Sequence, residues 1–194
     1  MANIIVKLNN AKDIPNLDER PHIKVDDLVL TYHLFVGEDK DRIATTPIMY
    51  NTMRLFNVTE DDLKDALTES QKTMPEHIQG LTEVIMEMTG MKPSPEEKEK
   101  DKVVVVTNTR RLNGASALFY PGVMEKMAKR FGGNYYVLPS SIHEVLCVKD
   151  DGVDVNELRK MVKEVNETQV APKERLSDNV YYYNAETKAF GIAR

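Results

Sequence analysis

The densest group of reactive side chains lies in the segment YYVLPSSIHEVLCVKDD, residues 135–151. Its Ser141, His143 and Cys147 are residue types that act as nucleophiles, bases and metal ligands. If residues 142–148 form a strand, His143 and Cys147 lie on one face of it. Four residues of strand then separate them by about 13 Å, whereas the donor atoms of two ligands of one zinc ion lie within roughly 4 Å of each other. The spacing therefore argues against a shared metal site.

A hydrolase is the catalytic alternative for this segment, because Ser141 and His143 are two residues apart and could project in the same direction. A triad also needs a carboxylate that orients the imidazole from its far side. Glu144 is expected on the opposite face, so the acid would have to come from elsewhere, for example Asp178. No G-x-S-x-G elbow occurs in the sequence. We therefore favour a structural interpretation, in which Ser140 and Ser141 belong to a hairpin turn.

Two arginines lie beside another expected turn, in the segment TRRLNGA. Asn113 and the glycine after it are typical of a tight turn. Guanidinium groups next to backbone N–H groups could bind a phosphate or a carboxylate. Exposed arginines more often pair with neighbouring acids, so we prefer that Arg110 and Arg111 pair with the acidic first half of the chain.

Loops that follow strands and helices usually supply binding residues. Three such loops, TRRLNGA, PSSIHE and NETQVAPKERLSD, would build a site if they converged. The ligand-binding candidates are Arg110, Arg111, Asn113, Ser140, Ser141, His143, Glu144 and Asp178.

Composition limits the classes of function. The net charge of −5 argues against general binding to nucleic acid or to an anionic membrane. The single cysteine favours a reducing compartment. The N-terminus has no signal-peptide pattern, and no apolar run approaches the length of a membrane span. The sequence also contains no phosphate loop and no dinucleotide fingerprint, so we expect a cytoplasmic protein without a cofactor.

The segment MKPSPEEKEKDK, residues 91–102, divides the chain. It is almost devoid of apolar residues and is predicted to be a charged linker between two lobes. Residues 1–90 hold 9 Lys and Arg against 16 Asp and Glu, a net charge of −7, whereas residues 103–194 and the linker together hold 17 against 15, a net charge of +2. An acidic decoy that occupies a nucleic-acid-binding protein is therefore a further alternative.

The first lobe is predicted to contain two strands, NIIVKL and DLVLTYHLFV, followed by helices. Thr46 and Pro47 signal the start of a helix that ends at Asn57, and Thr59 caps the next one with Asp62. A third helix is expected through PEHIQGLTEVIMEMTG, with an apolar stripe that faces inward. These elements form the predicted acidic lobe.

The second lobe is predicted to alternate strands and helices. The expected strands are VVVVTN, ASALFY, NYYVL and HEVLCV, and a C-terminal hairpin turns through NAET. Helices are expected after Pro121 and after Asp154. The predicted fold class is α/β or α+β, with a mixed β-sheet, helices packed on it, and two lobes joined by the charged linker.

Several segments resemble the bacterial domain-of-unknown-function family DUF5688. They are VVVVTNTRRLNGASALFYPGVMEKMAKRFGGNYYVLPSSIHEVLCVKDDG, the tail ELRKMVKEVNETQVAPKERLSDNVYYYNAETKAF, and the earlier IATTPIMYNTMRLFNVTEDDLKDAL. The motif positions are Asn113, Gly114, Tyr120, Pro121, Gly122, Pro139, Ser140, Ser141, His143, Glu144, Asn166, Thr168, Val170, Ser177 and Asp178. The resemblance implies a further N-terminal region that this chain lacks, and it implies no activity, substrate or cofactor.

Because no complete triad, metal cluster or phosphate loop can be assembled, we expect a non-catalytic binding module. Its partner is expected to be a protein or a small anionic ligand.

Overall fold

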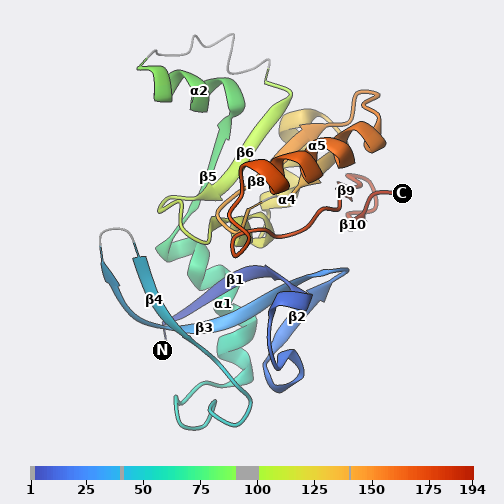
Figure 1. Ribbon diagram of the computed structural model, residues 1–194. Coiled ribbons are helices and arrows are strands. Elements are labelled where there is room, and N and C mark those ends of the chain that lie inside the picture. The colour runs from blue at the N-terminus through green and yellow to red at the C-terminus, as the bar shows by residue number, and fades with distance from the viewer. Residues whose placement is uncertain (1–2, 40–41, 91–100, 140) are drawn as a thin grey trace.

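The computed structural model describes residues 3–39, 42–90, 101–139 and 141–194. Helices and strands both contribute extensively, and the strands form two separate sheets (Figure 1). The α+β class is therefore confirmed. In chain order, the elements are β1 (Ile4–Asn10), η1 (Ala11–Asp13), η2 (Leu17–Glu19), β2 (His22–Val25), β3 (Leu28–Asp39), β4 (Arg42–Pro47), α1 (Glu60–Thr73), β5 (Glu76–Gly80), α2 (Leu81–Thr89), β6 (Val103–Asn108), η3 (Gly114–Phe119), α4 (Val123–Phe131), β7 (Tyr135–Leu138), β8 (Val145–Lys149), α5 (Val155–Thr168), β9 (Tyr181–Tyr183) and β10 (Phe190–Ile192).

The first sheet is built around the long strand β3, which contains all but the first residue of the predicted strand DLVLTYHLFV. β1 pairs with it on one side, while β2 and β4 pair with successive parts of its other side. Ile4, Val6 and Leu8 alternate along β1 towards the buried face, as the period of two residues in a strand requires. α1 packs against β1 through Leu63 and Ala66.

The second sheet has the order β10-β9-β7-β8-β6-β5. All pairings in the described residues are antiparallel, so the predicted mixed sheet is wrong. The chain crosses over from β6 through α4 to β7, which would suit a parallel pair. β8 instead fills the place between those two strands and runs antiparallel to both.

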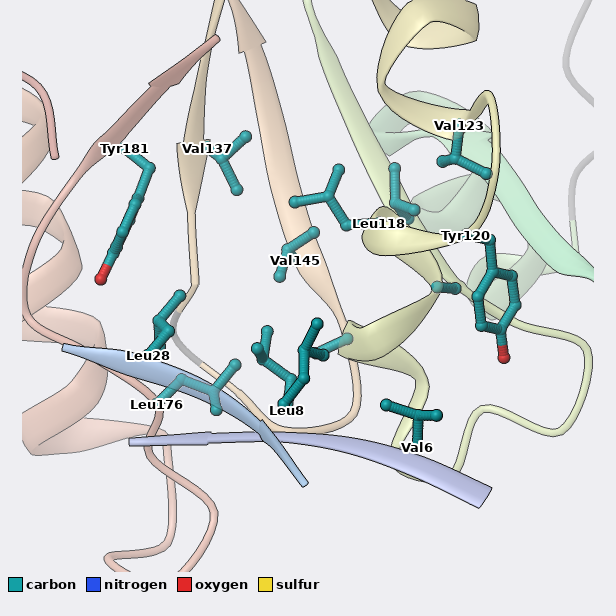
Figure 2. Close-up of a cluster of buried hydrophobic side chains, with 14 of the residues drawn as sticks. Val6, Leu8, Leu28, Leu118, Tyr120, Val123, Val137, Val145, Leu176 and Tyr181 are labelled. Carbon is teal, nitrogen blue, oxygen red and sulfur yellow. The ribbon is translucent and has the colours of Figure 1, made fainter. Parts of the chain in front are cut away.

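The main hydrophobic core lies between the two sheets. Figure 2 shows Leu8 and Leu28 of the first sheet pointing towards Val137 and Val145 of the second, with Val6 on the side of Tyr120. On the opposite face of the second sheet, Leu158 and Val162 of α5 form a smaller core. The second sheet is therefore covered on both sides, which agrees with the run of four valines that begins β6.

The predicted helix from Thr46 to Asn57 is wrong. Pro47 ends the edge strand β4, where a missing N–H is tolerated. The following residues form a series of turns, in which the Thr52 hydroxyl accepts a hydrogen bond from the Met49 N–H and donates one to the Met49 carbonyl. Ile48 is fully buried at the start of this segment and anchors it to the core.

The third predicted helix is correct only in its second half. Residues 76–80 form β5, in which Ile78 lies opposite Val106 of β6. α2 begins at Leu81 and ends before Gly90, whose φ is 74°. Its predicted inward stripe is also wrong, because Ile85 is 52% exposed and Met88 is 84% exposed.

The predicted strand ASALFY is the 3-10 helix η3. Its small residues Gly114, Ala115 and Ala117 are buried, and Gly114 packs so closely on β6 that an added Cβ would lie 2.7 Å from the Asn108 nitrogen. The Ser116 hydroxyl bonds the carbonyl of Asn113 and helps to close this tight turn.

Other predicted elements are confirmed. Thr59 and Asp62 form a reciprocal capping box at the start of α1, and Asp154 caps α5. β9 and β10 form the C-terminal hairpin, in which Asn184 accepts two backbone hydrogen bonds.

The two predicted lobes share structure in the residues that are described. β5 precedes the predicted linker but is an edge strand of the second sheet. The main core likewise combines Leu8 and Leu30 with Val104 and Leu118. Most of the predicted linker, residues 91–100, lies outside the described residues.

Candidate functional site

The three loops singled out from the sequence meet in the structure. The Asn113 N–H donates to His143 Nδ1 at 3.3 Å, which joins the first loop to the second. The Ile142 N–H donates to the carbonyl of Glu174 at 2.8 Å, and Ser141 forms a bridge with Arg175. The second loop therefore lies between the other two.

His143 does not lie on a strand. β8 begins at Val145, so the predicted strand is wrong for residues 142–144, where the chain bends. The Thr107 hydroxyl donates to the His143 carbonyl at 2.7 Å and holds the bend against β6. Gly114 packs at the same point, where an added Cβ would lie only 2.6 Å from the His143 carbonyl oxygen.

The imidazole of His143 has a neighbour at each ring nitrogen. Nδ1 accepts the hydrogen bond from Asn113, so the proton of the neutral ring lies on Nε2. Nε2 is 3.6 Å from Glu174 Oε1, a carboxylate that the sequence did not identify. The Ser141 hydroxyl accepts a hydrogen bond from the His143 backbone N–H, at 3.1 Å. Among the described residues, no hydrogen bond links that hydroxyl to the ring.

The remaining candidates lie apart from this junction. Arg111 reaches Gln79 at 2.9 Å and Glu87 at 3.4 Å, an acid of the first half, as preferred from the sequence. Asp178 accepts a hydrogen bond from Asn166 of α5 at 2.7 Å.

Two further candidates, Arg110 and Glu144, are exposed. The Arg110 backbone N–H donates to Asn108 Oδ1 at 3.0 Å, which places this arginine in the turn after β6. Ser140 lies outside the described residues.

A pocket of about 390 Å³ opens beside the junction. We call it the loop pocket, and its lining residues are Asn9, Asn10, Asp13, Ile14, Ile142, Pro172, Lys173 and Arg175. The volume is in the range of small-molecule sites. Sequence reasoning missed the wall formed by residues 9–14, although the polar run directly after β1 was a usable signal.

The loop pocket carries opposite charges on its two walls. Asp13 belongs to the wall from β1 and η1, whereas Lys173 and Arg175 belong to the wall between α5 and β9. Within the described part of the chain, neither Asp13 nor Lys173 forms an ion pair. Arg175 is held by Val170, whose carbonyl accepts from Nε at 3.0 Å.

The two asparagines of the pocket differ in what they can offer a ligand. Asn10 is buried and uses its amide group on Lys12, Asp27 and Leu176. Asn9 donates to Thr31 at 3.1 Å, which leaves its Oδ1 as an acceptor. The wall from β1 therefore presents acceptors.

Next to the pocket, a partly buried network joins the two sheets. We call it the Asp27 clamp, and its members are Asn10, Asp27, Ser177 and Tyr181. The Ser177 hydroxyl donates to Asp27 Oδ2 at 2.6 Å, and the Tyr181 hydroxyl donates to the other carboxylate oxygen. Burial, together with this hydrogen bond to a carboxylate, raises the pKa of Tyr181. The phenol therefore stays protonated and keeps donating.

A larger hollow of about 460 Å³ lies over the C-terminal hairpin. It is lined by Tyr136, Tyr182 and residues 189–194, and Arg194 is its one charged lining residue. The loop pocket has a more specific set of charges, and it adjoins the converging loops, so we regard it as the candidate site.

The remaining reactive groups are the cysteine thiol and the side chains of metal-ligating type. Burial raises the pKa of the Cys147 thiol, which keeps it protonated and unreactive. Over residues 3–39, 42–90, 101–139 and 141–194, no group of His, Cys, Asp and Glu side chains is arranged to hold a metal ion. A search of the same residues finds no helix that is both long and apolar enough to span a membrane.

Comparison with known proteins gives one match. The model of the family of unknown function DUF5688 matches residues 1–185. No curated protein and no solved structure matches the chain. The expectation that the chain lacks a region of the family is corrected, because the family model matches the chain from residue 1 to residue 185. The chain belongs to the family of unknown function DUF5688.

Proposed function

We propose that this chain is a non-catalytic binding module and that its loop pocket takes a small zwitterion, such as an amino acid or the end of a peptide. One observation carries the proposal: the two walls of the pocket bear opposite charges, and neither Asp13 nor Lys173 is paired within the described residues. A zwitterion supplies the complementary charge to each wall.

The basic wall suits a carboxylate. The Lys173 ammonium is exposed, so an incoming anion can reach it. Arg175 is already oriented by the bond from its Nε to Val170, and a guanidinium held in place loses little freedom on binding.

The acidic wall suits an ammonium group. Asp13 supplies a carboxylate. Asn9 supplies its side-chain Oδ1, while its Nδ2 donates to Thr31. Between the walls, Ile14, Ile142 and Pro172 provide apolar contact for an aliphatic side chain. This combination favours an apolar amino acid over a purely anionic ligand.

Binding without catalysis is supported by the contacts of His143, whose ring nitrogens face Asn113 and Glu174. The hydrolase alternative therefore gains no support. The acidic decoy gains none either, because three acids of α1 have local partners: Asp62 caps the helix, Asp61 pairs with Lys64 and Glu69 pairs with Lys72. A cytoplasmic location is part of the proposal, supported by the free, buried Cys147.

The test is an NMR titration with L-leucine, observed at the backbone amides of residues 9–14 and 172–175. Isocaproate and isoamylamine serve as single-charge probes that keep the aliphatic tail. We expect leucine to bind about tenfold more tightly than either probe, because each charge-assisted hydrogen bond contributes more than 1.4 kcal/mol, roughly a factor of ten.

Two variants identify the walls. Lys173→Met should reduce leucine affinity to that of isoamylamine, and Asp13→Asn should reduce it to that of isocaproate. The exposed residues Lys160 and Asp18 provide matched controls, Lys160→Met and Asp18→Asn, which should leave binding unchanged. Equal affinity for leucine and for the single-charge probes would refute the proposal.

A further inference from the structure

The outer face of the first sheet, opposite the main core, carries a group of basic residues. The antiparallel register places Lys7 of β1 and His22 of β2 on either side of Thr31 of β3. His33 lies two residues further along β3 on the same face. Arg20 precedes β2, and it is close enough to His33 for its positive charge to lower the pKa of that imidazole. We call Lys7, Arg20 and His33 the basic cluster.

Two shielded donors of the basic cluster lack acceptors. Asn9 Nδ2 donates to Thr31 Oγ1, which lies 3.0 Å from His33 Nε2. With the hydroxyl proton directed at Nε2, the proton of the neutral ring lies on Nδ1. His33 Nδ1 and Arg20 Nε are both shielded from solvent, and neither has a hydrogen-bond partner among the described residues.

The charge of the cluster is not balanced locally. Burial, followed by the positive charges of Lys7 and Arg20, lowers the pKa of His33 to about 3. Burial also lowers the pKa of Lys7. In the described part of the chain, Lys7 forms no ion pair. Lys24 adds a further positive charge to the same face, opposite Val29.

We infer that the basic cluster is a binding site for a phosphate group, separate from the loop pocket. A phosphate offers several acceptor oxygens and a negative charge, so it can pair with the Lys7 ammonium and the Arg20 guanidinium, and its charge acts on the neighbouring His33 ring. Lys7 is only partly buried and gives the site its contact with solvent. The inference does not depend on the zwitterion proposal, because none of the three basic residues lines the loop pocket.

The experiment follows the His33 ring by NMR during titration with inorganic phosphate, against sodium chloride of matched ionic strength. We expect saturable shifts with phosphate alone and a higher pKa of His33 in its presence, because a bound anion favours the imidazolium. Glycerol phosphate is the second probe. Tighter binding of glycerol phosphate would indicate a phosphate ester as the ligand, and tighter binding of inorganic phosphate would indicate the free ion.

Lys7→Met should weaken phosphate binding about tenfold, the expected cost of one charge-assisted contact. Its aliphatic chain keeps the packing of the lysine stem. Lys173→Met is the matched control, since it removes a lysine of the loop pocket and should leave the His33 response unchanged. A His33 ring that does not respond to phosphate in the unmodified protein, or that responds equally in Lys7→Met, would overturn the inference.

Discussion

The Asp27 clamp and the loop pocket share Asn10 but use polar groups in opposite ways. In the clamp, the Asp27 carboxylate accepts hydrogen bonds from Ser177 and Tyr181 and from Asn10. In the pocket, Asp13 and Lys173 have no partners among the described residues. Polar groups that satisfy one another hold the sheets together, whereas exposed charges without partners remain available to a ligand. The comparison separates residues that maintain the architecture from residues that could recognise another molecule.

The largest expected effect comes from removing the centre of the clamp. Asp27→Ala leaves the hydroxyls of Ser177 and Tyr181 without their acceptor, and should lower the free energy of unfolding by about 3 kcal/mol. Chemical denaturation measures this change. The exposed neighbour Asp26, whose carboxylate bonds the Ile192 N–H, supplies the control Asp26→Ala, with a smaller expected loss of about 1 kcal/mol. Equal losses in both variants would mean that the clamp has no special role.

Acid should lower the stability of the protein through the third polar region, the basic cluster. His33 has a folded-state pKa of about 3, below its ordinary value of 6.5, so the unfolded chain binds this proton first. The contribution of His33 is complete above the ordinary pKa and is lost as the pH falls towards 3. The slope should reach about 1.4 kcal/mol per pH unit.

His33→Gln removes this titration. The free energy of unfolding of the His33→Gln variant should therefore fall less steeply as the pH is lowered than that of the unmodified protein. Urea denaturation between neutral and acidic pH measures this difference. Parallel curves for the two proteins would show that His33 is readily protonated in the fold, contrary to its buried position.

A smaller effect is expected where the loops meet. His143→Ala leaves the Asn113 N–H without its acceptor and should cost about 1 kcal/mol of stability. It should also perturb the amide of Glu174, which an NMR spectrum would report. Glu144→Ala, at the exposed neighbouring position, should cost less than 0.5 kcal/mol. A large loss in the Glu144 variant would indicate that the bend, rather than the imidazole, organises the junction.

Much of the fold followed from local sequence patterns. β3 and β6 are rich in β-branched and apolar residues, and α1 has its capping box, so each signal agreed with the final structure. The failures came where local preference and tertiary contact disagree. Residues 76–80 could continue a helix, but pairing of Ile78 with Val106 makes them a strand. η3 was missed because its small residues are selected by close packing against β6, which no local period reveals.

The site was only partly predictable for a similar reason. The loops around Asn113, His143 and Glu174 could be proposed to meet, because each follows or precedes a regular element. The wall of the loop pocket formed by residues 9–14 could not be predicted, because Asn9 and Asp13 lie near Lys173 only through the packing of the two sheets. The role of Glu174 was hidden as well, because a carboxylate near a histidine in space lies far from it in sequence.

The pairing of β5 with β6 has a consequence for how this chain tolerates change in length. Gly80 lies opposite Val104, so the pairing of β5 with β6 involves only residues before α2 and residues after Asp101. The Thr82 hydroxyl donates to Asp101 Oδ1, which ties the two ends of the departing segment to each other. We therefore expect that residues inserted between Gly90 and Asp101 would leave the pairing of β5 with β6 intact. A reporter or a second protein could be attached within this range.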